Sequence, residues 1–378
     1  MANKLYCGWD VGGAHLKAAL LDAEGNVQRV LQLTCALWLG LDMLENAIDQ
    51  ILLDFYASTK NAPLSHGVTM TGELVDLFAN RQEGVQEISR TMHEKLGKQV
   101  FFFCAHTNKV YDFVDYVDVN QHWPQIASAN WLASASLVGK RIPTGLLIDM
   151  GSTTTDFVLL HHNKPQCLGF SDAARLASKE LVYTGVVRTP LMALCQAVIF
   201  QGKSTGIAAE YFATTADVYR LLGELPTDED MADTADGKDK STVATARRIA
   251  RMIGCDAEDA GLKDWQALAR NFKQLQLAML QKAALKHIAR LKKLAPDLDH
   301  INIIGAGAGQ FLLKALVEIL NQQQTTMTEK IQFQYVDCGS LMLTNMEAEN
   351  AQQNPLANWT TICLPAVAAA KLAFDQFQ

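Results

Sequence analysis

Hydrophobic and polar positions divide the chain into two stretches that begin in the same way. Each opens with an apolar strand that ends in aspartate, continues through a short turn of small residues, and returns in a second apolar strand. A third strand follows in both, so each half is expected to begin with three strands joined by tight turns. These strands are predicted at Lys4–Asp10, Leu16–Leu21 and Val27–Thr34, and at Gly145–Asp149, Asp156–His161 and Gln166–Phe170.

After each set of three strands, helical and strand patterns alternate. Apolar residues recur every three or four positions where helices are expected, and short apolar runs mark further strands. Three strands followed by alternation predict an α/β protein that differs from a plain Rossmann repeat, which begins β-α-β. The helices are predicted at 41–57, 84–95, 123–139, 172–179, 214–222, 242–253, 265–294, 311–320, 341–350 and 364–377, and the further strands at 66–70, 100–104, 301–304 and 331–336.

Three segments have a character of their own. Residues 108–122 alternate aromatic residues or valine with aspartate and are expected to connect elements near the surface. The helix at 123–139 is rich in alanine and serine, which would let another helix cross it closely, although plain core packing explains the same composition. Pro226–Ser241 is acidic and rich in turn residues, so it is expected to be a mobile, solvated loop rather than a metal site.

Composition narrows the functional classes. Hydrophobic residues make up 49% of the chain and charged residues 19%, as in ordinary globular proteins. The net charge of −7 and the lack of a long Lys/Arg run argue against a nucleic-acid partner. The sequence has no secretory signal pattern and no membrane-length apolar run, so no membrane partner is expected. Eight scattered cysteines without a C-x-x-C pair favour free thiols and a reducing, cytoplasmic location.

Three glycine turns carry the candidate chemistry. Asp10-Val-Gly-Gly and Asp149-Met-Gly-Ser-Thr join strands, and the turn at 305–309 joins a strand to a helix. Such turns offer backbone N–H groups and hydroxyls to phosphate, and a carboxylate suits Mg²⁺. Asp10 and Asp149 are therefore candidate Mg²⁺ ligands and catalytic residues, unless they only cap turns. The candidate phosphate- or nucleotide-binding residues are Gly12, Gly13, Lys17, Gly151, Ser152, Thr153, Thr154, Gly305, Gly307 and Gly309.

Two further side chains are candidate catalytic groups. Glu73 follows a buried strand at a glycine turn and is expected to act as a general base or behind a metal ligand; the alternative is an acid near the start of the next helix. Arg188 stands in an uncharged stretch and is expected to bind diphosphate or a substrate carboxylate, unless it forms a structural ion pair. Asp172 and Tyr183 are weaker candidates, and His15 is expected to be partly buried and hydrogen-bonded.

The three turns, in this order, resemble those of the actin-like ATPase superfamily, which includes sugar kinases and Hsp70-type ATPases. The resemblance implies two ribonuclease H-like lobes around a central cleft, with phosphate loops at 10–17 and 149–156 and an adenosine loop at 303–309. The implied domains are a first lobe at 1–122, a connecting helix at 123–143, a second lobe at 144–363 with a helical insertion at about 224–295, and a C-terminal connecting helix at 364–378.

Four longer strings narrow the resemblance. VTMTGELVDLF, DMGSTTTD, ELVYTGVVRTPL and EYFATTADVYRLLG resemble one branch of the hydantoinase/oxoprolinase-like family. Members of that branch are associated with tetrahydromethanopterin-linked one-carbon metabolism and with methanofuran biosynthesis. The resemblance implies a transferase that joins a furan-methyl diphosphate to the phenol of a tyramine- or tyrosine-derived acceptor and releases diphosphate. Its implied partners are these two small molecules, and its implied cofactor is Mg²⁺.

Two other classes of function stay open on the residues alone. An ATP-dependent hydrolase or a small-molecule kinase would use the turn at 305–309 for adenosine, with ATP as a ligand. The Pro-Gly-Pro motif that is usual in large hydantoinase and oxoprolinase subunits is absent from the sequence, which argues against hydrolysis of a cyclic amide. A non-catalytic actin-like protein is the third class, and the sequence leaves the oligomeric state open.

Overall fold

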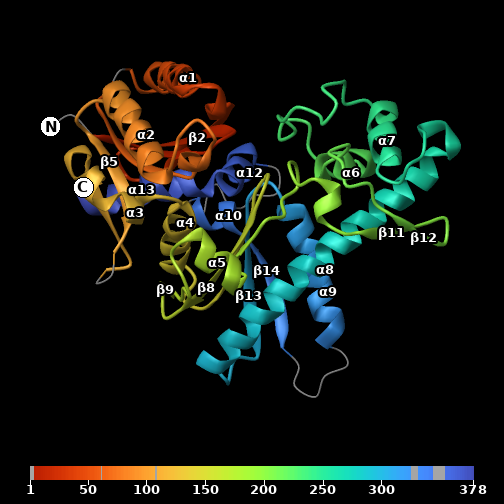
Figure 1. Ribbon diagram of the computed structural model, residues 1–378. Coiled ribbons are helices and arrows are strands. Elements are labelled where there is room, and N and C mark those ends of the chain that lie inside the picture. The colour runs from red at the N-terminus through yellow and green to blue at the C-terminus, as the bar shows by residue number, and fades with distance from the viewer. Residues whose placement is uncertain (1–3, 61, 107–108, 325–330, 344–353) are drawn as a thin grey trace. The chain divides into compact units, whose positions relative to one another are not determined.

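The computed structural model describes residues 4–60, 62–106, 109–324, 331–343 and 354–378, and these form an α/β protein as the sequence predicts (Figure 1). The strands are β1 Leu5–Val11, β2 His15–Leu21, β3 Val27–Thr34, β4 Leu64–Met70, β5 Val100–Ala105, β6 Tyr111–Asp115, β7 Gly145–Met150, β8 Thr155–His161, β9 Lys164–Pro165, β10 Leu181–Val182, β11 Ala197–Phe200, β12 Lys203–Gly206, β13 His300–Ala306 and β14 Gln332–Asp337. The α-helices are α1 Leu41–Thr59, α2 Arg81–Leu96, α3 Val119–Ile126, α4 Asn130–Gly139, α5 Asp172–Ser178, α6 Thr215–Leu222, α7 Thr242–Arg251, α8 Leu262–Leu294, α9 Gln310–Gln324, α10 Cys338–Met342, α12 Pro355–Ile362 and α13 Leu364–Phe377. Short 3₁₀ helices lie at Leu37–Leu39, Gly72–Leu74, Tyr116–Asp118, Leu191–Ala193 and Ala257–Asp259.

The first sheet has the strand order β3-β2-β1-β4-β5-β6. Strands β1, β2 and β3 form an antiparallel meander, and β4 and β5 then add in parallel to β1. This order, with the first strand in the centre, is the ribonuclease H-like arrangement that the resemblance implied. The parallel pairing of β1 with β4 brings the ends of both strands to one edge of the sheet, where Asp10 and Glu73 are expected to act.

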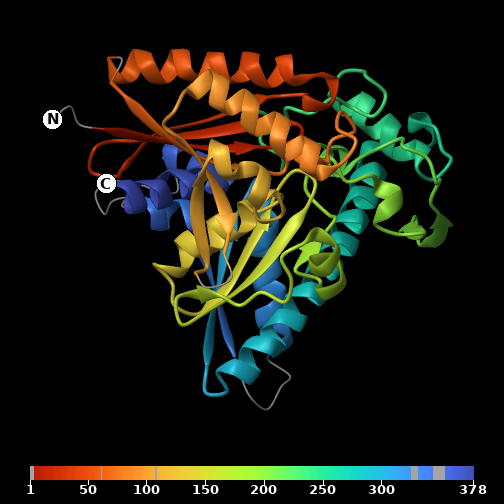
Figure 2. The ribbon, with the colours of Figure 1, turned by 60° about the vertical axis from the view of Figure 1, so that its left-hand side comes forward.

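Alternation along β1 decides how helices cover this sheet. Cys7, Trp9 and Val11 belong to a buried hydrophobic cluster with residues of α1 and α2. Gly8 points to the opposite face, where an added Cβ would lie 1.9 Å from the carbonyl oxygen of Ala366 in α13. The missing side chain therefore lets α13 lie directly on the strand, and α1 and α2 lie on the other face of the sheet (Figure 2).

The second sheet has the order β10-β8-β7-β13-β14, with β9 paired to β8. It again places the first strand of its half, β7, in the centre, so the predicted α/β class with two ribonuclease H-like sheets is confirmed. The predicted strand at 166–170 is wrong. Besides β7, the short strands Lys164–Pro165 and Leu181–Val182 pair with β8, because the chain leaves the sheet after Lys164–Pro165 and returns to it after α5.

The chain divides into two compact units. One contains Met1–Leu147, Val158–Ser178 and Asp337–Gln378, and the other contains Ile148–Phe157 and Lys179–Val336. In the second unit, α6 and α7 pack on the long helix α8, and the two-stranded ribbon β11–β12 contacts the same helix. The helical region expected at about 224–295 corresponds to α7, α8 and the segment before them.

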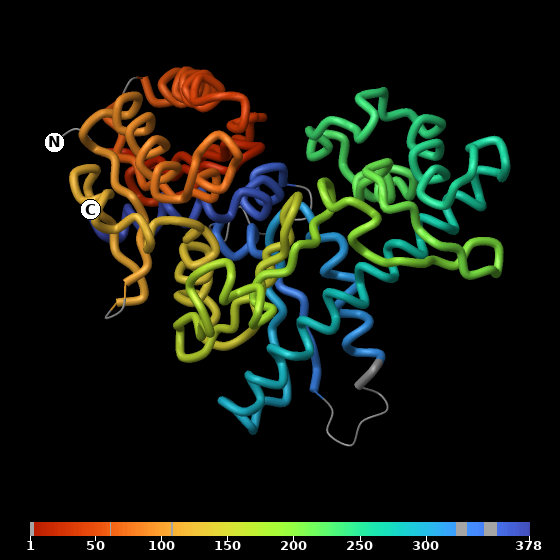
Figure 3. Tube along the Cα trace, in the orientation of Figure 1, coloured from red at the N-terminus to blue at the C-terminus, as the bar shows by residue number. Residues whose placement is uncertain are grey.

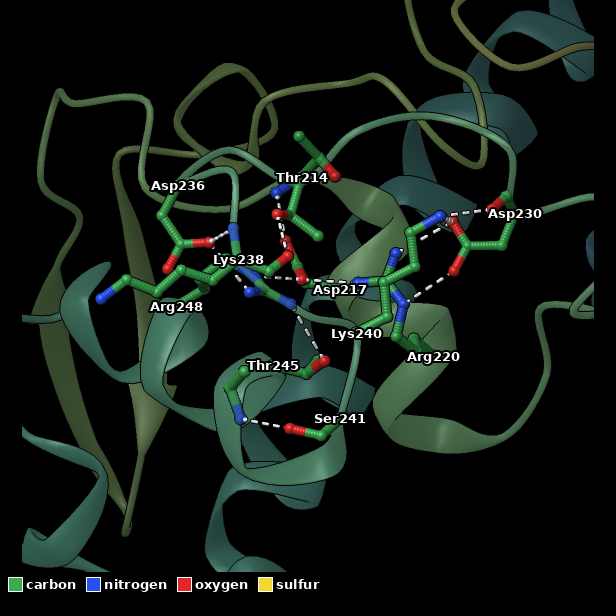
Figure 4. Close-up of polar contacts among 12 residues, drawn as sticks. Thr214, Asp217, Arg220, Asp230, Asp236, Lys238, Lys240, Ser241, Thr245 and Arg248 are labelled. Carbon is green, nitrogen blue, oxygen red and sulfur yellow. Dashed lines mark hydrogen bonds and ion pairs between the residues drawn. The ribbon is translucent and has the colours of Figure 1, made fainter. Parts of the chain in front are cut away.

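The segment 226–241, which connects α6 to α7 (Figure 3), is a largely exposed loop, as its composition predicts, but hydrogen bonds from two arginines connect it to the flanking helices. Arg220 of α6 donates two hydrogen bonds to Asp230, of 2.8 and 2.9 Å. Arg248 of α7 is fully buried and donates to Asp236 at 3.0 Å and to the carbonyl oxygen of Asp239 at 3.1 Å. Figure 4 shows these contacts, which tie both ends of the segment to the helices that flank it.

Asp217 joins the two arginines. Its Oδ1 accepts from Arg220 Nη1 and from Arg248 Nε, both at 2.8 Å, while its Oδ2 accepts the N–H of Thr214 at the start of α6. A carboxylate that is almost fully buried is thus compensated by two guanidinium groups. Asp230 and Asp236 of the segment 226–241 complete this network, whereas Asp228, Asp233 and Asp239 are exposed.

Three other sequence expectations need correction or fall outside the described residues. The helix predicted at 123–139, and so the continuous connecting helix at 123–143, is interrupted between α3 and α4, where Ser128 adopts a φ of 50°. The segment at 108–122 contains strand β6, paired antiparallel with β5, because Phe113 packs into the interior. The helix predicted at 341–350 lies mostly outside the described residues, and α10 ends at Met342.

Within the described residues, no single helix has the length and apolar character needed to cross a bilayer. The consecutive helices α12 and α13 meet that test only when taken together, and they are bent by 90° relative to each other. Most of α13 is buried, and it covers the face of the first sheet to which Gly8 and Gly67 belong.

Candidate active site

The first glycine turn is held so that its amides stay available. Gly12 donates its N–H to the carbonyl oxygen of His15 at 3.0 Å, which closes the β1–β2 hairpin. The carbonyl oxygens of Gly13 and Ala14 accept hydrogen bonds from backbone N–H groups of the segment 35–37. The amide N–H groups of Gly13 and Ala14 have no acceptor among the described residues. This turn therefore presents donors, as an anion site requires.

The second turn repeats this arrangement. Gly151 donates to the carbonyl oxygen of Thr154 at 2.9 Å, and the carbonyl oxygens of Gly151 and Ser152 accept from the N–H groups of 186–188. The amides of Ser152, Thr153 and Thr154, and the buried hydroxyl of Ser152, have no hydrogen-bond partner in the described part of the chain. The matched pair of turns predicted from the sequence is thus present, with the same closing bond in each.

A buried amide supports the second turn from behind. An added Cβ on Gly185 would lie 2.4 Å from the carbonyl carbon of Ser152, so only glycine allows this contact. Gln276 of α8 donates to Thr184 Oγ1 at 2.7 Å and to the carbonyl oxygen of Gly185 at 2.8 Å, and Tyr219 donates to the amide oxygen of Gln276. The position of the turn is therefore set partly by α8.

Asp10 lies at the end of β1 and is 3% exposed. Lys17 is its partner in the β1–β2 ladder, and Lys17 Nζ lies 3.8 Å from Asp10 Oδ2. Asn130, the first residue of α4, places its Nδ2 3.4 Å from Asp10 Oδ1. Asp10 shares the strand face of Gly8, and alternation along β1 thus turns its carboxylate toward the side of α13 and α4.

Asp149 has the equivalent position in β7, and the third glycine turn packs against it. An added Cβ on Gly307 would lie 2.6 Å from Asp149 Oδ1 and 2.3 Å from the carbonyl oxygen of Met150, and Gly307 has a φ of 81°. Gly309 donates its N–H to the same Met150 oxygen at 2.8 Å. Only glycine allows this close approach at both positions, so the second and third turns lie directly beside each other.

Glu73 is the centre of a second polar cluster in the first unit. The side chain is 1% exposed, and its Oε1 accepts from Ser128 Oγ at 2.7 Å. Ser128 Oγ also lies 3.3 Å from Asp172 Oδ2, which is bonded to Arg81 Nη2 at 2.7 Å. Glu73 Oε2 is buried and has no hydrogen-bond partner among the described residues.

The Glu73 cluster adjoins the first turn. Gly72, the residue before Glu73, approaches the turn so closely that an added Cβ would lie 3.2 and 3.3 Å from the carbonyl oxygens of Val11 and Gly12. On the other side, Gly84 lets α2 press against the backbone of Glu73, with an added Cβ only 2.6 Å from its carbonyl oxygen. The carboxyl group is therefore held at the edge of the sheet where Asp10 also lies.

Burial raises the pKa of Glu73 above its usual value. The hydrogen bond from Ser128 opposes this rise, the nearby charge of Asp172 adds to it, and the charge of Arg81 lowers the pKa again. Such a carboxyl group holds its proton to higher pH than an ordinary glutamate does.

This shift predicts a pH dependence of stability. Because the folded pKa is raised, the contribution of neutral Glu73 is fully present below the unfolded value of about 4.5 and is lost as pH rises through the folded pKa. Urea unfolding of the wild type is expected to show a free energy of unfolding that falls over this window, and Glu73→Gln should lack this fall. Glu45→Gln, a change at an exposed glutamate, should keep the wild-type dependence; equal pH profiles for all three proteins would contradict the prediction.

The remaining predicted residues take different places. Arg188 is exposed, and its backbone N–H donates to the carbonyl oxygen of Ser152 at 2.8 Å, which places it beside the second turn. Tyr183 is 53% exposed. Asp172, a weaker candidate, belongs to the Glu73 cluster, and His15 is half-buried at the first turn, as expected.

Sequence reasoning missed Ser128, Asn130 and Arg81. The first two lie inside the stretch that was predicted to be a continuous helix, where serine and asparagine appeared to be ordinary small or polar residues. The sequence held one indication of these two residues, because serine and asparagine cluster before an apolar helix. The same pattern marks an ordinary helix start, so it did not indicate a functional site. Arg81, at the first position of α2, gave no signal, because its partner Asp172 lies 91 residues further along the chain.

The donor set limits how a metal ion could be held. In the described part of the chain, no group of three or more His, Cys, Asp and Glu side chains is arranged to bind a metal. The carboxylates at the ends of β1 and β7 are oxygen ligands of the kind that Mg²⁺ takes, one or two at a time, together with substrate phosphates and water.

Comparison with known proteins identifies the class. The model of the hydantoinase/oxoprolinase family matches residues 65–334, and this chain belongs to that family. The chain is 30% identical over 254 residues to the (4-{4-[2-(γ-L-glutamylamino)ethyl]phenoxymethyl}furan-2-yl)methanamine synthase of Methanocaldococcus jannaschii, covering 66% of this chain and 72% of the synthase. The protein of the same name from Methanococcus vannielii is 28% identical over 180 residues, covering 47% of this chain and 78% of that protein.

Solved structures give a more distant match. A glucokinase of the ROK family from Streptomyces griseus, in complex with glucose and AMPPNP, has 14% sequence identity and a TM-score of 0.43, over 97% of this chain and 98% of that one. The (R)-2-hydroxyglutaryl-CoA dehydratase component A of Acidaminococcus fermentans has 10% identity and a TM-score of 0.43, over 98% of each chain. At this level of similarity, neither structure bears on what this chain binds.

Proposed function

We propose that the protein joins a furan-methyl diphosphate to the phenol oxygen of a tyramine- or tyrosine-derived acceptor and releases diphosphate. Family membership supports the proposal, as do the two relatives, whose names describe a phenoxymethyl furan. The observation that carries it is Glu73, a buried carboxyl group with one oxygen held by Ser128 and the other without a partner in the described residues, beside a turn that presents amide donors.

The residues divide the reaction between them. In the first unit, the amides of the first turn and Lys17 would bind phosphate oxygens, and Asp10 would be a Mg²⁺ ligand. In the second unit, the amides of the second turn and the hydroxyl of Ser152 would bind phosphate oxygens, Arg188 would add a positive charge, and Asp149 would be a Mg²⁺ ligand. Bound Mg²⁺ would neutralise charge on a leaving diphosphate. The carbon–oxygen bond to diphosphate breaks, the phenol oxygen forms the new bond to the methylene carbon, and Glu73 Oε2 takes the phenol proton.

The third glycine turn favours a second candidate. Gly307 and Gly309 pack against the Asp149 end of β7 and precede α9, and this is an arrangement that an adenine nucleotide would use. An ATP-dependent hydrolase or a small-molecule kinase on the same residues would therefore bind Mg·ATP. A furan-methyl diphosphate does not require this turn. The identity of the ligand that the protein binds therefore separates the two candidate functions.

One assay decides between them. Purified protein with Mg²⁺, a furan-methyl diphosphate and tyramine or γ-glutamyl-tyramine should give one ether, detected by mass spectrometry, for each diphosphate released. Glu73→Gln should form the ether on the order of 10²-fold more slowly or worse, and Glu45→Gln at the wild-type rate. Hydrolysis of ATP with tight calorimetric binding of Mg·ATP, and no ether, would replace the proposal with the second candidate.

A further inference from the structure

Ser128 lies between two carboxyl groups in a way that fixes the number of protons they hold. Its Oγ is 2.7 Å from Glu73 Oε1 and 3.3 Å from Asp172 Oδ2. A serine hydroxyl has one proton to donate. If both carboxyl groups were ionised, one of them would face the lone pairs of Oγ. A single proton on one carboxyl group removes that repulsion, because this group then donates to Oγ while Oγ donates to the other.

The surroundings decide which carboxyl group carries the proton. Arg81 Nη2 bonds directly to Asp172 Oδ2 at 2.7 Å, so the charge-assisted hydrogen bond of the cluster lies on Asp172 and not on Glu73. Glu73 is 1% exposed, and both charged groups that face it, Asp172 and Arg81, are already bonded to each other. With this single proton on Glu73 Oε1, the hydrogen bond between Glu73 and Ser128 runs in the reverse direction to that of the ionised carboxylate: Oε1–H donates to Ser128 Oγ, and Ser128 Oγ donates to Asp172 Oδ2.

The backbone at Ser128 is held in an unusual conformation that makes this geometry. Its φ of 50° lies in the left-handed region, which residues with a Cβ rarely adopt. The residue stands between the end of α3 and the start of α4, and it is buried. A strained, buried serine whose hydroxyl touches two carboxyl groups points to a role in handling a proton.

We propose that Glu73, Ser128 and Asp172 form a proton relay that carries the proton of the acceptor hydroxyl away from the reacting centre. When the acceptor gives its proton to Glu73 Oε2, the proton on Oε1 moves to Ser128 Oγ, and the hydroxyl proton of Ser128 moves to Asp172 Oδ2. Three O–H bonds break and three form, and one negative charge passes from Asp172 to the acceptor oxygen.

The exposure of the cluster gives the relay a direction. Glu73 is almost fully buried, whereas the side chains of Asp172 and Arg81 are 11% and 34% exposed. A proton on Asp172 is therefore closer to solvent than a proton on Glu73, and loss to water restores the Arg81–Asp172 ion pair. The identity of the proton donor rests on the proposed function. The resting protonation state of the cluster does not depend on that function.

The first test needs no substrate. Infrared spectra of the full-length protein should show the C=O stretch of a protonated carboxyl group at neutral pH, and this band should be missing in Glu73→Gln. In Asp172→Asn the same band should change position or titrate at a different pH. A band that survives in Glu73→Gln, or the lack of any such band in the wild type, would overturn the relay.

The second test uses turnover. Ser128→Gly removes the hydroxyl, and glycine adopts the left-handed backbone conformation without strain. This variant should lower kcat by on the order of 10²-fold and change the kcat–pH profile. The solvent isotope effect should also fall, since fewer protons move together. Ser136→Ala is the matched control, because it removes a buried hydroxyl of α4 that donates to the carbonyl oxygen of Leu132 within the same helix. Equal kinetics for Ser128→Gly and Ser136→Ala would refute the relay.

The two tests separate the relay from the proposed function. If the wild type forms no ether but the infrared band behaves as expected, the proposed function fails and the relay stands as a device for a different hydroxyl acceptor. If ether forms and the band does not belong to Glu73, the function stands and the relay fails. Melting temperatures of the Ser128 and Ser136 variants identify any loss of folding.

Discussion

Arg248→Met is expected to lower the free energy of unfolding by about 3–5 kcal/mol, because it removes one partner of a buried charge network. Arg248 is fully buried and bonds to Asp217 and Asp236, so its loss leaves carboxylates with less compensation inside the second unit. Methionine keeps most of the length of the side chain, which limits the effect of a cavity. Urea unfolding followed by circular dichroism measures the change.

Arg251→Met is the matched control for this result. The residue lies one turn further along α7, its side chain is 39% exposed, and its Nη1 is 3.9 Å from Asp236 Oδ2. An exposed ion pair of this kind contributes at most about 1 kcal/mol. If the two variants lose equal stability, the network around Arg248 does not hold the segment 226–241 in place.

Asp10→Asn is expected to lower kcat by on the order of 10²–10³-fold, because a preorganised charge at the reacting centre is commonly worth that much. The amide keeps the shape of the side chain and can still contact Asn130, so the fold should persist. Asp149→Asn should act in the same way at the end of β7. Initial rates of diphosphate release at saturating substrate measure both effects.

Binding gives a second measurement that does not depend on turnover. Calorimetric titration with Mg·diphosphate should show weaker binding to Asp10→Asn than to the wild type. Asp49→Asn changes an exposed aspartate that pairs with Lys95, and it should match the wild type in rate and in binding. Near-normal rates in Asp10→Asn would remove Asp10 from the active site.

The sequence was most informative where structure is decided locally. The two hairpins with Asp10 and Asp149 follow from alternation and from small turn residues, and both have the same closing hydrogen bond. The third strand of the second half was wrong because only tertiary pairing decides which short segment lies beside β8. The residues at 166–170 have strand propensity but find no partner strand in the described structure.

The polar networks could not be predicted for a related reason. The acidic residues of 226–241 predict a solvated loop, and the segment is largely exposed. The contacts of Asp230 and Asp236 could not be predicted, because Arg220 and Arg248 stand outside the segment on helices with ordinary amphipathic patterns. Ser128 was hidden in the same way, since its importance comes from Glu73 and Asp172, which lie 55 and 44 residues away in sequence. The composition of a segment gives its charged residues, but the residues that compensate those charges lie elsewhere in the chain and are known only from the packing.

The packing of α13 on the first sheet has a consequence for synthesis of the chain. Gly8 and Gly67 lie against α13, and Lys371 of this helix donates to the carbonyl oxygen of Gly25, 346 residues earlier in the sequence. At about 5–20 residues per second, a ribosome needs on the order of tens of seconds to make the intervening chain. During that time one face of β1 and β4 lacks the helix that covers it. The nascent sheet is therefore a natural client for chaperones that shield apolar strands.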